Sequence, residues 1–140
     1  MAPIDFEVCG ESYQLLPHTG FASFDLARKV QHFCTNLYSS PRLAGLDSKS
    51  EEYALEFLNA FSDEIFELSS SEFRSLVENT LCRVTVTSEG KQNVALGNFE
   101  AISAHFGNRY TDMYTVMFKV WILSKFPPFG EAPETQTAGA

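Results

Sequence analysis

The 140-residue sequence lacks the short motifs that carry common catalytic chemistry. It contains no Gly-x-Ser-x-Gly nucleophile elbow, no phosphate-binding P-loop and no Gly-x-Gly-x-x-Gly dinucleotide fingerprint. His32 and Cys34 are close in sequence, but residues two apart on a helix point in different directions and do not form a nucleophile and base pair. The sequence therefore predicts a protein that is not an enzyme.

The sequence also contains few cysteine, histidine or acidic residues at the spacing that metal sites require. The three cysteines, Cys9, Cys34 and Cys82, form no Cys-x-x-Cys pair, and the three histidines are scattered. Glu52 and Glu56 lie four residues apart, as in a carboxylate metal site, but no Glu-x-x-His follows them. A solvated helix face is the simpler interpretation of this pair. We therefore expect no metal and no cofactor.

Basic residues and long apolar runs are few. The formal net charge is −8, from 18 acidic and 10 basic residues, which works against binding of nucleic acid or anionic membranes. No run approaches the roughly 20 apolar residues of a membrane span. The N-terminus lacks the basic and apolar segments of a secretory signal, and the separated cysteines fit a reducing compartment. These features predict a cytoplasmic protein that binds neither nucleic acid nor membranes.

Apolar side chains, in contrast, are abundant enough for the core of one domain: 44% of the residues are hydrophobic and 13 are phenylalanine. Their spacing predicts an α+β fold that is mainly helical. Alternating residues over 6–16 predict an N-terminal β-hairpin that turns at Gly10-Glu11, and residues 83–96 predict a second short hairpin around Gly90. Periodic apolar residues predict a bundle of helices over 23–38, 50–68, 69–81, 98–106 and 110–125.

Helix boundaries have their own signals. Ser69 and Glu72 match a capping box at the start of a helix, and Pro127-Pro128 should stop the last one. We expect a single domain over residues 1–130 and a disordered tail over 131–140, which has no bulky side chains. In the helix over 50–68 the predicted core stripe consists of Ala54, Leu58, Phe61, Ile65 and Leu68.

The helix near the C-terminus is unusually apolar, because only Thr115 and Lys119 interrupt residues 113–123. A helix that is apolar all round must be buried in a core or against a partner. One face, which includes Met113, is expected in the core, and the aromatic second face is expected to remain for a partner. The candidate partner-binding residues on the two faces are Tyr110, Tyr114, Met117, Phe118, Trp121 and Ile122.

The order of these elements resembles the short tail assembly chaperones of long-tailed bacteriophages. The resemblance covers about residues 5–130 and is carried by four segments. They are Phe-Glu-Val-Cys-Gly-Glu-Ser-Tyr at 6–13, Phe-Ala-Ser-Phe-Asp-Leu-Ala-Arg-Lys-Val at 21–30, Asp-Met-Tyr-Thr-Val-Met-Phe-Lys-Val-Trp at 112–121, and Phe-Pro-Pro-Phe at 126–129.

The resemblance implies a protein that binds the tape-measure protein and helps recruit tail-tube subunits, without catalysis. Such a protein works in the host cytoplasm and is not expected in the mature virion. The apolar helix also leaves self-association open. Two alternatives remain: a structural tail-completion or head-tail joining subunit that stays in the virion, or a small cytosolic adaptor.

Overall fold

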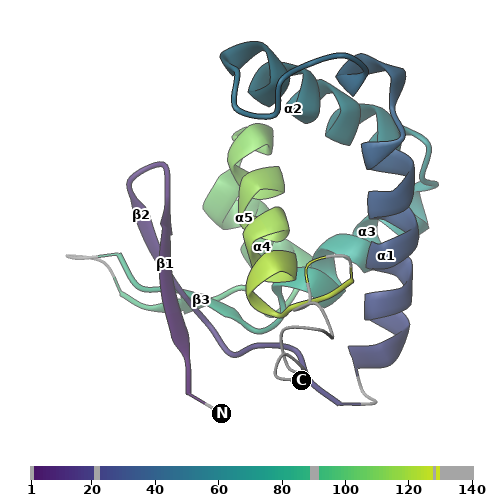
Figure 1. The fold of residues 1–140 in the computed structure, drawn as a ribbon. Coiled ribbons are helices and arrows are strands. Elements are labelled where there is room, and N and C mark those ends of the chain that lie inside the picture. Colours follow the sequence, from purple (N-terminus) through teal and green to yellow (C-terminus); the bar gives the residue numbers. More distant parts are fainter. Residues whose placement is uncertain (1, 21–22, 89–91, 128, 130–140) are drawn as a thin grey trace, which may run out of the picture.

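The computed structural model describes residues 2–20, 23–88, 92–127 and 129. Within these ranges five α-helices pack beside a four-stranded antiparallel sheet, which confirms the predicted α+β, mainly helical class (Figure 1). The helices are α1 (Phe24–Tyr38), α2 (Glu51–Phe66), α3 (Ser70–Leu81), α4 (Phe99–Phe106) and α5 (Tyr110–Leu123), with a 3₁₀ helix at Pro41–Leu43. The strands are β1 (Ile4–Val8), β2 (Glu11–Leu15), β3 (Val84–Val86) and β4 (Val94–Ala95).

The predicted N-terminal hairpin is present, with its turn one residue earlier than expected. Val8 pairs with Glu11, so Cys9 and Gly10 form the turn. Their φ angles are 51° and 83°. Two successive residues with positive φ are typical of the type I′ turn, whose twist matches that of the flanking strands. Cys9 therefore occupies a left-handed position that favours glycine or asparagine.

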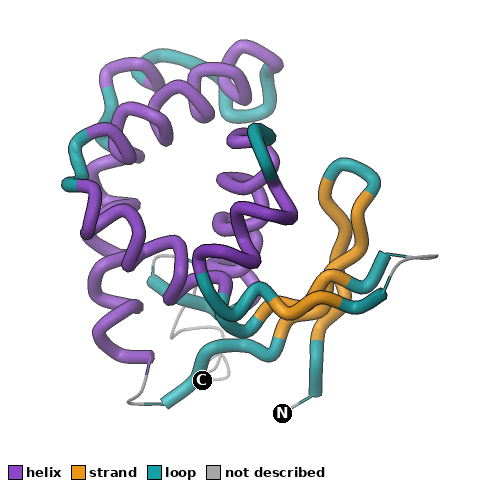
Figure 2. The backbone as a smooth tube through the Cα atoms, turned by 180° about the vertical axis from the view of Figure 1, so that it is seen from behind, coloured by secondary structure: helices purple, strands orange, loops and turns teal. Residues whose placement is uncertain are grey.

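The two predicted hairpins form one sheet, in the order β1-β2-β3-β4. Tyr13 pairs with Val86 and Leu15 with Val84, which joins segments far apart in the sequence. Figure 2 shows this sheet to one side of the helices. The apolar sheet residues belong to the same core cluster as the buried helix residues. The predicted turn at Gly90 lies outside the described residues.

The predicted capping box at the start of α3 is confirmed. The Ser69 hydroxyl accepts a hydrogen bond from the Glu72 backbone N–H at 3.1 Å, and the Glu72 carboxylate accepts one from the Ser69 N–H at 2.9 Å. These bonds satisfy two backbone donors that the helix itself leaves unpaired. The Asn98 side chain caps α4 in a similar way, accepting from the Ala101 N–H at 2.8 Å.

The part of α2 that contacts the core is shorter than predicted. Ala60 and Phe61 are its buried residues, whereas Ala54 is exposed, so the predicted core position of Ala54 is wrong. The Phe57 ring lies 5.1 Å from the Phe118 ring of α5. Ala54 lies on nearly the same side of α2 as Phe61, but it belongs to the first turn and a half of the helix, where most residues are exposed, and the contact with the core begins only at Phe57.

The last helix ends before the prolines. The Phe126 N–H donates to the Trp121 carbonyl at 3.1 Å and the Lys125 N–H to the Ile122 carbonyl at 3.0 Å. Lys125 has a φ of 59°. This pair of bonds with a left-handed residue is a Schellman motif, which terminates the helix at Leu123 and turns Phe126 into the core. Pro128 and the predicted tail over 131–140 lie outside the described residues.

His18, which follows β2, is buried beside α3 and the end of α5. Its ring Nε2 lies 3.0 Å from the Thr80 carbonyl oxygen, and its ring packs against Phe126. Burial lowers the pKa of His18; the hydrogen bond to Thr80 opposes this shift, and the positive charge of Arg83 adds to it. The unfolded chain, in which histidine titrates at about 6.5, therefore takes up the proton first as the pH falls.

We accordingly expect His18 to make the protein less stable as the pH falls from 7.5 to 5.5, because protonation favours the unfolded chain. The measurement is urea unfolding at both pH values for the wild type and for His18→Gln. The wild type should lose more free energy of unfolding over this interval than the variant does. Equal losses would show that His18 does not contribute to the pH dependence.

Candidate protein-binding surface

The first face of α5 is the centre of the core. Trp121 is 0% exposed, and its ring lies 5.5 Å from the Phe33 ring and 5.7 Å from the Phe61 ring. Its indole N–H donates to the Thr80 hydroxyl at 3.1 Å. Met117 is also fully buried. Met117 and Trp121 are therefore corrected from candidate binding residues to core residues, since neither presents surface to a partner.

The middle of the second face of α5 is partly covered by α2, which lies above α5 in Figure 1. Tyr114 lies 5.3 Å from the Phe61 ring, and Phe118 lies 5.1 Å from the Phe57 ring. Phe118 also meets the ring of Phe129 at 5.1 Å. Tyr114 and Phe118 are half-buried in consequence. The predicted open aromatic face did not include these contacts with α2.

Two candidate residues remain at opposite ends of α5. Tyr110, in the first turn, is 61% exposed, and Ile122, in the last turn, is 37% exposed. They are separated by about three helical turns, with half-buried residues between them. The helix therefore presents two separate apolar spots and no continuous apolar face.

The most exposed large apolar side chain in the described residues belongs to α2. Phe66 is 86% exposed and Leu55 is 59% exposed. They are about three turns apart and so share one side of the helix, with the small, exposed Ser62 between them. We call these three residues the outer face of α2. It points away from the buried residues Ala60 and Phe61.

Carboxylates accompany the outer face of α2. The helix contains no lysine or arginine. Glu52, Glu56, Asp63 and Glu67 follow one another at helical spacing along one flank. Arg42, from the preceding 3₁₀ helix, pairs with Glu56 at 3.3 Å and Asp63 at 2.6 Å, so one guanidinium serves two carboxylates. The surface thus combines an apolar stripe with an acidic flank, which suits a partner helix whose apolar stripe has a basic flank.

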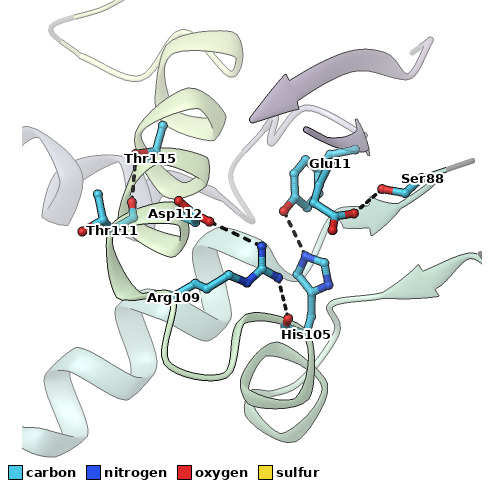
Figure 3. A network of polar contacts seen from close by, with 8 residues as sticks. Glu11, Ser88, His105, Arg109, Thr111, Asp112 and Thr115 are labelled. Carbon is cyan, nitrogen blue, oxygen red and sulfur yellow. Dashed lines mark hydrogen bonds and ion pairs between the residues drawn. The ribbon is translucent and has the colours of Figure 1, made fainter. Parts of the chain in front are cut away.

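A polar network beside the sheet is the other concentration of functional groups (Figure 3). The Tyr13 hydroxyl lies 2.9 Å from His105 Nε2, and Arg109 donates to the His105 carbonyl at 2.7 Å and to Asp112 at 3.4 Å. Burial raises the pKa of Tyr13 to about 12, so its hydroxyl stays protonated at neutral pH. These groups bond to one another and join β2 to α4 and α5, which is a structural role.

The thiols are held in their neutral form. Burial raises the pKa of Cys34 to about 12. A hydrogen bond with Asp112 raises the pKa of the exposed Cys9, and a small loss of hydration and the negative charge of Asp112 add to this shift. The thiolate is the nucleophilic form of cysteine, so both side chains are poorly reactive at neutral pH.

The part of the chain that the structure describes also lacks candidate metal sites and membrane-spanning helices. No group of three or more His, Cys, Asp or Glu side chains there could hold a metal ion. No helix in residues 2–20, 23–88, 92–127 and 129 is long and apolar enough to cross a membrane. No protein-family model, curated protein or solved structure matches this chain.

Proposed function

We propose that this protein is a tail assembly chaperone of a long-tailed bacteriophage and that it binds the tape-measure protein through the outer face of α2. The observation that carries the proposal is the 86% exposure of Phe66. A large aromatic side chain left in water on a helix that also exposes Leu55 supports a protein-binding role for this face. The resemblance in element order and in the four segments described above supplies the identity of the partner.

The chemistry of this surface supports a role in assembly. A tape-measure protein awaiting assembly exposes apolar helical surface, and an apolar stripe on α2 could cover part of it. The carboxylates beside the stripe would keep the complex soluble and favour segments flanked by lysine or arginine. In this proposal the protein acts without catalysis in the host cytoplasm, helps bring tail-tube subunits to the complex, and leaves before the virion is complete.

Replacing Phe66 with serine tests the proposed surface. We expect the variant to lose about 1 to 4 kcal/mol of affinity for a soluble tape-measure fragment, because exposed aromatic anchors dominate such contacts. Its urea unfolding midpoint should stay close to that of the wild type, since Phe66 makes little contact with the core. Isothermal titration calorimetry measures the affinity.

Val94→Ser is the matched control, because Val94 is an exposed apolar residue on β4, away from α2. It should leave the affinity unchanged. Tyr110→Ser examines the exposed end of α5. If Phe66→Ser binds like the wild type while Tyr110→Ser does not, the site lies on α5 and the proposal for α2 is wrong.

Purified virions separate the chaperone from a structural subunit retained in the particle. The chaperone proposal requires that mass spectrometry of virions does not find this protein in stoichiometric amounts, although infected cells contain it. A constant number of copies per particle would instead favour a tail-completion or joining subunit.

A further inference from the structure

A groove of about 790 Å³ lies between α1 and α3, on a part of the surface distinct from the outer face of α2. Leu26 and Phe33 of α1 and Leu76 of α3 contribute apolar side chains to it. Small polar residues of α3, including Ser75, line the same wall as Leu76. The groove extends along α1 from Leu26 to Asn36, about 15 Å at 1.5 Å per residue, which is about three turns of a bound helix.

The α1 wall of the groove is basic. Arg28, Lys29 and His32 line it. Arg28 and Lys29 both pair with Asp25, at 3.1 Å and 3.2 Å, so two cations share one carboxylate. This wall therefore keeps a positive charge that is available to a ligand.

The opposite side of the groove is acidic. It is lined by three glutamates: Glu64 and Glu67 at the C-terminal end of α2, and Glu72 of α3. Within the described residues, no ion pair joins Glu64 or Glu67 to a lysine or arginine. Burial raises the pKa of Glu64, and the neighbouring carboxylates of Glu67 and Asp63 raise it further. These carboxylates repel one another, and a cation from a partner would relieve that repulsion.

The two sides are close enough for their charges to interact. Hydrogen bonds from Ser69 lower the pKa of Glu72, and the positive charge of Lys29 adds to this effect from across the groove. The charge of His32 acts on Glu64 in the same direction. A ligand in the groove would therefore meet a positive wall on one flank and a negative wall on the other.

We propose that this groove binds an amphipathic helix of a partner protein, with carboxylates on the flank that faces α1 and lysine or arginine on the flank that faces α2 and α3. The apolar floor is small, since it is made of the partly exposed Leu68 and the edges of the nearly buried Leu26, Phe33 and Leu76. The rim charges therefore select the flanks of the helix and fix its direction. The groove shares no residue with the outer face of α2, although Glu67 belongs both to its acidic side and to the acidic flank beside that face. The variants that test the inference therefore change Lys29 and Ser75, which line only the groove, so their failure would not bear on the function proposed above.

Three synthetic helical peptides test this inference against the full-length protein by fluorescence anisotropy. All three carry the same leucine stripe. One has glutamates on one flank and lysines on the other, the second has lysines on both flanks, and the third has glutamates on both. We expect the mixed peptide to bind about tenfold tighter than either of the others at low salt, and this preference to shrink at high salt.

Reversing the charge at Lys29 is the most decisive test of the proposed charge selection, because it should change which peptide binds best. Lys29→Glu makes both walls acidic, so the peptide with lysines on both flanks should become the preferred ligand. Lys49→Glu is the matched control, because it makes the same change in net charge at an exposed residue that does not line the groove. It should keep the preference of the wild type.

Ser75→Trp adds a bulky side chain to the groove wall and should abolish binding of all three peptides, with an unfolding midpoint near that of the wild type. Several results would overturn the inference. They are equal affinities for the three peptides, no binding of any peptide to the wild type, the same peptide preference in Lys29→Glu and Lys49→Glu, and undiminished binding to a folded Ser75→Trp variant.

Discussion

Replacing Trp121 with alanine should lower the free energy of unfolding by about 3 to 5 kcal/mol, one of the two largest effects expected of a single substitution in this chain. The indole is fully buried between Phe33 and Phe61. Its removal leaves a cavity and also leaves the buried Thr80 hydroxyl without its indole donor. Since domains of this kind are stable by about 5 to 15 kcal/mol, this loss removes a substantial part of the total stability. Urea unfolding followed by circular dichroism measures the loss.

Two controls separate the cavity from the lost hydrogen bond. Trp121→Phe keeps an aromatic ring in the core and should cost less than Trp121→Ala. Combining Trp121→Phe with Thr80→Val removes both polar partners, and the double variant should be more stable than the sum of the single losses predicts. If Trp121→Ala unfolds at the urea concentration of the wild type, the indole does not occupy the core as described.

Phe61→Ala should lower the free energy of unfolding by a comparable amount, about 3 to 5 kcal/mol. Unlike the loss of Trp121, this change should weaken mainly one helix, α2. Phe61 is the large buried side chain through which α2 meets the core, and its ring contacts Phe33, Tyr114 and Trp121. Ala60 is the other fully buried residue of this helix. We therefore expect α2 to open locally before the rest of the protein unfolds. Hydrogen exchange should show faster exchange of α2 amides, with α3 and α5 still protected.

Opening of α2 would also uncover Tyr114 and Phe118, so an apolar dye should bind Phe61→Ala more strongly than the wild type. Phe66→Ala is the control, because it removes the same ring from the same helix at an exposed position. It should change neither the exchange pattern nor the stability. Uniform loss of protection in Phe61→Ala would contradict a separately opening α2.

The fold could be predicted wherever the signal was local. The hairpin at the N-terminus, the capping box of Ser69 and Glu72, and the periodic helices depend on residues a few positions apart, and the structure contains all of them. The joining of the two hairpins into one sheet could not be predicted, because neither segment carries a local sequence signal for the pairing of Tyr13 with Val86. The exposure of Ala54 was missed for a similar reason, since tertiary packing decides which turns of α2 contact the core.

The candidate surface depended on tertiary packing even more. The apolar character of α5 was evident from residues 113–123, but the cover over Tyr114 and Phe118 is supplied by Phe57 and Phe61. One signal for the outer face of α2 was present in the sequence. Leu55 and Phe66 fall outside the predicted stripe of that helix, and large apolar residues away from a core stripe are candidates for exposure. The opposed charges of the groove required the relative placement of three helices.

The position of β3 in the sheet has a consequence for synthesis of the chain. Strand β2 emerges from the ribosome early, yet its second neighbour, β3, follows only after α1, α2 and α3 have been made. At roughly 5 to 20 residues per second, the intervening stretch of about 70 residues takes about 4 to 14 s to translate. During that interval one edge of the hairpin has no strand beside it, and a lone two-stranded hairpin is only marginally stable in water. Co-translational folding of this protein should therefore begin in the helices and finish in the sheet.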